Sequence, residues 1–190
     1  MEAFSDGVIA ILITIMVLEL RAPGGTDLAA LRPLLPVLLS YVLSFVFLGI
    51  YWSNHHHLLQ ATQQVNGAIL WANLHLLFWL SLVPFVTAWM GEHSFAAMPV
   101  ALYGVVLFCA AVAYYLLTRV LIAYHGCNSR LGHAVRQDVK GRVSIALYAA
   151  AIPLAFFNRW FACAIYVIVA IMWLVPDRRI EQELARTGGE

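Results

Sequence analysis

The sequence predicts an all-α membrane protein with six transmembrane helices in each subunit, and three observations support this fold class. First, 63% of the 190 residues are hydrophobic and only 11% are charged, whereas a soluble globular domain carries about 45–50% apolar and about 25% charged residues. Second, the mean hydropathy is +0.82. Third, six apolar stretches approach the roughly 20 residues that a helix needs to cross the hydrocarbon core of a bilayer.

The first span, 4–20, is predicted to be a retained helix and not a cleaved signal peptide. A signal peptide begins with a basic region and ends at a small-residue cleavage site. This stretch instead begins with Glu2 and Asp6, and its apolar run ends in the sequence Leu-Glu-Leu-Arg at residues 18–21.

The other five spans follow in order at 34–52, 67–90, 98–120, 143–157 and 160–176. A turn-rich segment around Pro23 precedes the second span, and the polar segment 125–142 separates the fourth from the fifth. Pro153 in the short fifth span predicts a kink or a tight joint to the sixth. Residues 177–190 are expected to form a charged cytoplasmic tail. The two halves share no repeated pattern, so residues 1–190 are predicted to form a single domain.

The basic residues predict the orientation of the chain. If the N-terminus is cytoplasmic, only Arg21, Arg32 and Arg159 of the eleven Lys and Arg residues fall outside the cell. An excess of basic residues marks the cytoplasmic side of a membrane protein. Both termini are therefore predicted to be cytoplasmic.

Composition also argues against several partners. The net charge is +1 and no basic block occurs, which disfavours nucleic acid and leaves the lipid bilayer as the expected environment. The three cysteines share no close spacing that would predict a zinc site or a disulfide framework: Cys109, Cys127 and Cys163. The run His55–His57 does not predict a metal site either, because adjacent side chains on a helix point about 100° apart. No metal and no cofactor are expected.

One face of the first span carries a continuous stripe of side chains. At about 100° per residue, the stripe centred on Ile11 comprises Phe4, Gly7, Ile11, Thr14, Ile15 and Leu18. Asp6 lies about 140° from Ile11 and is expected to face a neighbouring helix. Such a stripe usually packs against lipid or protein, but rings of apolar side chains can also gate a pore by excluding water.

Polar residues near the cytoplasmic end are expected to join the helices. Ser5 and Asp6 open the first span, and His55 and His56 follow the end of the second. Because an unpaired Asp in a membrane is costly, we expect Ser5 and Asp6 to bond the histidine segment, with a proton-sensitive gate as the alternative role. Asn73, inside the third span, is expected to form an interhelical hydrogen bond.

The sequence resembles a known membrane-protein family along nearly its whole length. Residues 2–8 (Glu-Ala-Phe-Ser-Asp-Gly-Val) and 17–20 resemble the first helix of the bacterial relatives of the lysosomal and endosomal potassium channel, the transmembrane-protein-175 family. Residues 52–56, 82–87 and 173–177 match later parts of the family pattern. Two places depart from that pattern: the given sequence begins after the position, four residues before Phe4, where the family usually has Arg, so that Arg is either truncated or absent, and His57 stands where the family often has Arg.

This resemblance implies a homotetramer in a bacterial plasma membrane, with four copies of the first helix around a potassium-permeable pore. Its aliphatic layers map onto Ile11, Ile15 and Leu18, and Thr14 occupies the position linked to potassium preference, so permeant K⁺ is expected near Ile11 and Thr14. The Thr-Val-Gly-Tyr-Gly filter of ordinary potassium channels is absent from the family and from this sequence. The resemblance also implies a structural motif network formed by Phe4, Ser5, Asp6, Trp52, His55, His56 and Asn73.

The predicted function is therefore a passive potassium-permeable cation channel, gated or filtered by apolar rings of the first helix. The chain is not expected to be an enzyme, because no nucleophile or carboxylate pair converges in the pattern. The alternatives are a proton-coupled secondary transporter that uses Asp6 and the membrane histidines, and a membrane enzyme or haem protein. Transporters often contain inverted repeats and helices broken at matched positions, and neither is evident here.

Overall fold

The computed structural model describes residues 1–60, 62, 64–125 and 139–174, and these residues form helices joined by short connections, with no strand among them. The elements are α1 (Glu2–Leu18), the 3₁₀ helix η1 (Leu28–Leu34), α2 (Leu35–Gln60), α3 (Gly67–Ser81), α4 (Val83–Glu92), α5 (Ala97–His125), α7 (Val139–Phe157) and α8 (Arg159–Leu174). Most of the predicted loop 125–142 and the whole predicted tail 177–190 lie outside the described residues.

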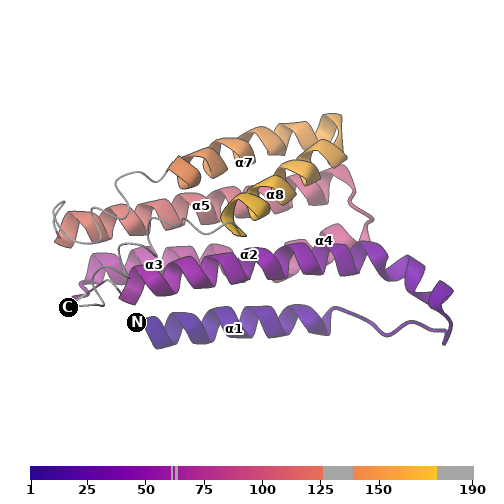
Figure 1. The fold of residues 1–190 in the computed structure, drawn as a ribbon, viewed down its shortest axis with the longest axis horizontal. Helices are drawn as coiled ribbons and strands as arrows, with labels where there is room; N and C mark the ends of the chain where they lie inside the picture. Colours follow the sequence, from indigo (N-terminus) through magenta and orange to yellow (C-terminus); the bar gives the residue numbers. More distant parts are fainter. Residues whose placement is uncertain (61, 63, 126–138, 175–190) are drawn as a thin grey trace, which may run out of the picture.

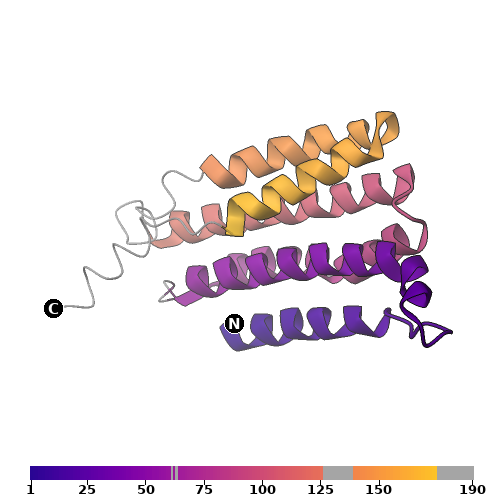
Figure 2. The same cartoon turned by 45° about the vertical axis from the view of Figure 1, so that its right-hand side comes forward.

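The helices lie roughly alongside one another and form a bundle (Figure 1). In both views α1 lies at one edge of the bundle and α7 at the opposite edge, with α5 between them (Figure 2). Helix α1 packs against α2, α3 and α4, whereas α5 packs against α3, α4, α7 and α8. The start of α1 and the end of α2 lie at the same end of the bundle (Figure 1), where His56 of α2 contacts Glu2 of α1.

The third predicted span is divided into two helices. Leu82 separates α3 from α4, and Pro84 occupies the first turn of α4. Proline has no backbone N–H to continue the ladder of hydrogen bonds, but it is tolerated at the start of a helix. The break therefore falls at Leu82, two residues before the proline. The ladder resumes with a hydrogen bond of 3.1 Å from Val86 N to Leu82 O.

Two other helix boundaries differ from those predicted from the sequence. Helix α2 continues beyond the predicted end at residue 52 and reaches Gln60, so the histidine run is helical. Between α7 and α8 only Asn158 is non-helical, and its Oδ1 accepts a hydrogen bond of 3.0 Å from Trp160 N. Asn158 thereby satisfies a free backbone N–H at the start of α8.

Four stretches among the described residues are long and apolar enough to cross a bilayer: Leu28–Gln60, Gly67–Glu92, Ala97–Tyr124 and Val139–Phe157. Helices α1 and α8 are shorter, at 17 and 16 residues. At 1.5 Å per residue, α1 is about 25 Å long, a little less than the roughly 30 Å hydrocarbon core. The six-span topology stays a prediction.

Small and polar residues let the helices approach closely in the interior. A Cβ atom on Gly91 of α4 would lie 2.5 Å from Ser40 Oγ and 2.7 Å from Val37 Cα of α2. Nearby, three buried hydroxyls pair across helices: Thr87 Oγ1 lies 2.6 Å from Ser44 Oγ, which lies 3.0 Å from Tyr103 Oη. Close contact through small residues and bonded hydroxyls is typical of helix packing in membranes.

Candidate functional site on the first helix

Helix α1 has one buried face and one exposed face. The buried side chains are Ser5, Ile9, Leu12 and Met16, which recur at spacings of three and four residues, as one face of a helix requires. The opposite face is apolar and uncovered in the single chain. Its exposed fractions are 58% for Phe4, 57% for Ile11, 41% for Ile15 and 78% for Leu18.

The predicted stripe therefore lies on the uncovered face of α1. Ile11, Thr14, Ile15 and Leu18 are all exposed. The Thr14 hydroxyl donates a hydrogen bond of 2.9 Å to Ile11 O one turn earlier in the same helix. Because a hydroxyl has one proton and two lone pairs, this bond uses the proton and leaves the oxygen of Thr14 free to accept from water or to face a cation.

A buried polar chain joins the other face of α1 to α2 and α3. His55 Nε2 lies 2.6 Å from Asn73 Oδ1, and Asn73 Nδ2 donates to Ser5 Oγ at 2.9 Å. The amide oxygen of Asn73 only accepts, so His55 must be the donor through Nε2–H. Ser5 Oγ in turn donates to Met1 O at 3.2 Å. The exposed fractions of Ser5, His55 and Asn73 are 0%, 0% and 2%, so these bonds form away from solvent.

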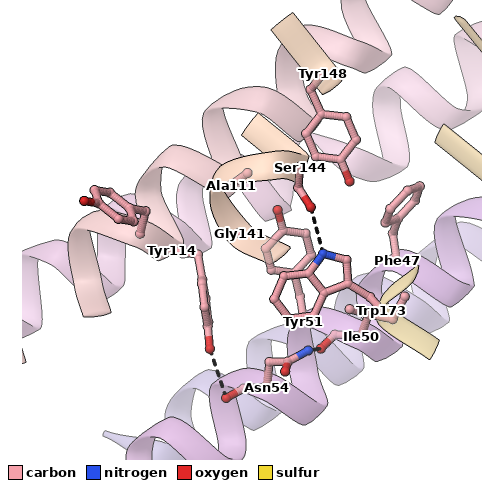
Figure 3. A pocket seen from close by; sticks show the side chains of 11 residues that line it. Phe47, Ile50, Tyr51, Asn54, Ala111, Tyr114, Gly141, Ser144, Tyr148 and Trp173 are labelled. Carbon is pink, nitrogen blue, oxygen red and sulfur yellow. Dashed lines mark hydrogen bonds between the residues drawn. The ribbon is translucent and has the colours of Figure 1, made fainter. Parts of the chain in front are cut away.

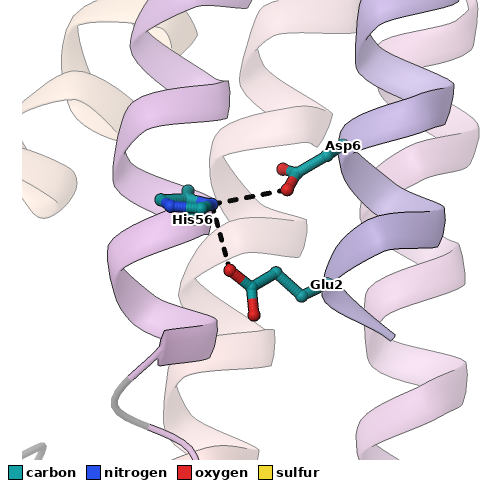
Figure 4. Close-up of side chains that lie close together, drawn as sticks. All are labelled: Glu2, Asp6 and His56. Atoms are coloured by element: carbon teal, nitrogen blue, oxygen red, sulfur yellow. Dashed lines mark hydrogen bonds and ion pairs between the residues drawn. The ribbon is translucent and has the colours of Figure 1, made fainter.

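A second polar cluster lies beside this chain, between α1 and α2 (Figure 4). His56 Nδ1 lies 3.2 Å from Glu2 Oε1 and 3.4 Å from Asp6 Oδ2. Gln60 Nε2 lies 2.9 Å from His56 Nε2, one turn along α2. The ring of Trp52 stacks on the His56 ring with centroids 5.7 Å apart.

The structure thus brings together most of the predicted motif residues, in two groups. Ser5, His55 and Asn73 form the buried chain, whereas Asp6, His56 and Trp52 meet in the second cluster. Phe4 lies on the exposed face of α1. Sequence reasoning missed the contributions of Glu2 and Gln60. The spacing of four residues between Glu2 and Asp6 was the available signal, because side chains four apart share a helix face.

An aromatic pocket lies elsewhere, among α2, α5, α7 and α8 (Figure 3). Trp173 Nε1 donates to Ser144 Oγ at 2.9 Å, and Tyr114 Oη donates to Asn54 O at 3.3 Å on its wall. The cavity volume is about 40 Å³, which suits a few water molecules and not a substrate. None of its lining residues comes from α1.

These features define a class of protein. Its described part is a bundle of apolar helices, and its distinctive surface is an uncovered apolar face on one helix that polar contacts hold to its neighbours. A helical integral membrane protein has this composition and this placement of polar groups between helices.

Comparisons with known proteins identify the family within this class. A family model described as the endosomal/lysosomal potassium channel TMEM175 matches residues 1–84. The chain is 53% identical over 184 residues to a potassium channel of a Chryseobacterium species, covering 97% of this chain and 96% of that one. It is 34% identical over 121 residues to a potassium channel of Streptomyces collinus, covering 60% of this chain and 59% of the relative.

A solved structure shows the same fold. The crystal structure of a lysosomal potassium-selective channel TMEM175 homolog from Chamaesiphon minutus matches with a TM-score of 0.79 and 27% sequence identity, covering 92% of this chain and 94% of that chain. The chain belongs to the TMEM175 family, and the predicted resemblance is confirmed. The family and these relatives are channels, which are not enzymes, so the prediction that this chain is not an enzyme is confirmed as well.

Proposed function

We propose that this chain is one subunit of a potassium-permeable channel in which four copies of α1 surround a central pore. The single observation that carries this proposal is the uncovered apolar face of α1, which lies opposite a face tightly packed against the bundle. One helix cannot enclose a water path, so a pore requires several copies around an axis, and closed rotational symmetry is the usual arrangement of identical subunits. The relatives named as potassium channels support K⁺ as the permeant ion.

The pore constriction is assigned to three apolar rings. Ile11, Ile15 and Leu18 are separated by four and three residues, so four subunits stack these side chains in layers about 4.5–6 Å apart. Aliphatic side chains cannot replace the water of an ion, and such rings block conduction when they are narrow and dry. The three apolar rings therefore close the pore when the four α1 helices lie close together. When the helices move apart, the rings restrict which ions pass.

Thr14 is the polar group in this face, and we assign it to potassium preference. Its proton is engaged with the Ile11 carbonyl, so its oxygen is presented as an acceptor. Four such oxygens in one layer offer a partly hydrated cation the ligands that the aliphatic layers lack. K⁺ loses its water at lower cost than the smaller Na⁺, so a weak ring of acceptors favours K⁺.

The buried polar chain is assigned a positioning role. Asn73 donates a hydrogen bond to Ser5 of α1 and accepts one from His55 of α2, and these two bonds help to fix the rotation of α1 about its axis. The contacts of Glu2 and Asp6 with His56 add a second restraint at the same end of α1, whereas the other contacts of α1 are mostly apolar and not directional. The rotation decides whether Ile11 and Thr14 face the pore axis or a neighbouring helix.

The proposed topology has six spans, a multi-pass placement in a bacterial plasma membrane and both termini in the cytoplasm. The apolar helices and the excess of basic residues on one side support it. The start of α1 and the end of α2 then lie at the cytoplasmic mouth. No cofactor is assigned. The transporter alternative is not favoured, because the relatives are channels.

The experiment is electrical recording of the purified full-length chain in a planar bilayer, with native mass spectrometry of the same sample. We expect tetramers and discrete K⁺ currents that persist without a pH gradient. A sample that is entirely monomeric would count against the pore. Potassium flux that requires a proton gradient would contradict the channel and support a proton-coupled transporter.

A further inference from the structure

The cluster of Glu2, Asp6 and His56 has the composition and spacing of a metal site. The two carboxylates lie four residues apart on α1, and both point toward the imidazole that projects from α2 (Figure 4). One ligand atom from each residue lies within 4.8 Å of the other two. Side chains at positions i and i+4 of a helix commonly share one ion, since they project from the same face.

The measured distances match those between the ligands of a small divalent ion. Metal–ligand bonds of about 2.0–2.1 Å around tetrahedral Zn²⁺ place neighbouring ligand atoms about 3.3 Å apart. His56 Nδ1 lies 3.2 Å from Glu2 Oε1 and 3.4 Å from Asp6 Oδ2. Both distances from the imidazole therefore suit such an ion, and the two carboxylate oxygens lie within 4.8 Å of each other, close enough for side-chain rotation on α1 to bring them onto the same ion.

Two further observations indicate that His56 satisfies the two carboxylates only in part. Asp6 Oδ1 is a buried atom that accepts no hydrogen bond within the described part of the chain. In addition, two carboxylates face one imidazole, so the cluster keeps an excess of negative charge whether or not His56 is protonated. The three side chains are partly exposed, but a buried carboxylate oxygen such as Asp6 Oδ1 normally has a bonding partner, and a cation at this position would supply one.

Gln60 can support either state of His56. In the structure Gln60 Nε2 lies 2.9 Å from His56 Nε2, a geometry that puts the proton of a neutral imidazole on Nδ1. When a metal occupies Nδ1, the proton moves to Nε2, and a rotated amide of Gln60 accepts it through Oε1. Such outer hydrogen bonds orient metal-binding histidines and fix their tautomer.

We propose that Glu2, Asp6 and His56 bind a divalent transition-metal ion, with water at the remaining position, and that this ion ties α1 to α2. One imidazole and two carboxylates suit Zn²⁺ and similar ions better than Mg²⁺, which prefers six oxygen ligands. The neighbouring histidines do not belong to the site. His57 is exposed, and His55 binds Asn73 through Nε2.

The test measures Zn²⁺ binding by calorimetry and thermal unfolding of the full-length protein in detergent, with Mg²⁺ as the comparison ion. We expect saturable binding of Zn²⁺ and a saturable rise in Tm. Glu2→Gln should weaken this binding at least about tenfold, since loss of outer-shell partners alone costs about 10–100-fold in metal affinity. His56→Gln should abolish Zn²⁺ binding, whereas His56→Cys should keep it, because a thiolate also binds Zn²⁺.

His57→Gln is the matched control, since it removes an adjacent imidazole that only packs edge-on against His56, with ring centroids 6.0 Å apart, and supplies no ligand atom to the cluster; it should bind Zn²⁺ as the parent does. The part of the Zn²⁺ affinity and of the rise in Tm that Glu2→Gln loses belongs to this site, and any part that it keeps belongs to another site. The proposal is overturned if the parent gains no stability from Zn²⁺, if Mg²⁺ stabilises it equally, or if Glu2→Gln and His56→Gln both bind as the parent does. None of these measurements requires conduction. A negative result would therefore rule out the metal site without bearing on the proposed channel function.

Discussion

Replacing Asn73 by Leu tests whether the buried polar chain holds α1 against α2 and α3. The Asn73 side chain accepts a hydrogen bond of 2.6 Å from His55 and donates one of 2.9 Å to Ser5. Leucine is apolar and of similar size, so Asn73→Leu removes both bonds without leaving a large cavity. The polar atoms of His55 and Ser5 that Asn73 had paired then remain buried without this partner.

The expected loss of stability follows from these two bonds. Interhelical hydrogen bonds in membrane proteins contribute about 0.6 kcal/mol on average and about 1.7 kcal/mol at most. Two of them give a predicted loss of about 1–3 kcal/mol in the free energy of unfolding. We expect the upper half of that range, because His55 is fully buried and leaving a buried polar group unpaired costs more than the bond contributes.

The assay is a titration of the folded protein with denaturing detergent, followed by tryptophan fluorescence, on Asn73→Leu, Ser5→Ala and the double variant. Directly bonded residues should show a coupling energy of at least about 0.5 kcal/mol. Ser81→Ala is the control on the same helix, since its hydroxyl bonds Phe78 O within its own turn; it should change stability by less than about 0.5 kcal/mol. Equal stability of Asn73→Leu and Ser81→Ala, or strictly additive losses, would refute the reasoning.

Two further predictions concern the pore wall and the packing of α2. Ile11→Asn should wet the narrowest ring, raising conductance and lowering potassium preference, and Thr14→Val should chiefly lower that preference in K⁺/Na⁺ bi-ionic recordings. Val17→Asn changes an exposed residue about 120° from Ile11 on the same helix and should alter neither conductance nor potassium preference. If Ile11→Asn and Thr14→Val both conduct as the parent does, α1 does not line the pore. Gly91→Ala should cost about 1–3 kcal/mol or more, because its Cβ would lie 2.7 Å from a backbone atom of α2. Gly49→Ala meets open space, so thermal unfolding should show no loss; equal Tm values for the two variants would contradict the close packing.

The helical membrane fold and the face of the candidate site were predictable from the sequence, because both depend on local pattern. Composition and the length of apolar runs predict helices in lipid. The 3.6-residue period places Ile11, Thr14, Ile15 and Leu18 on one face, and all four are exposed in the structure. The same period places Asp6 away from that face, and it contacts His56 of α2.

Other features depended on packing between distant segments. The sequence alone determined that α1 has an apolar stripe, but only the tertiary structure decided that this stripe is the uncovered face and that Ser5 meets Asn73 and His55. Those partners come from three helices, and their meeting depends on the rotation and offset of each helix, which periodicity within one helix does not encode. Glu2 gained its place beside His56 in the same way, because α2 continues as a helix to Gln60 and brings the imidazole to the start of α1.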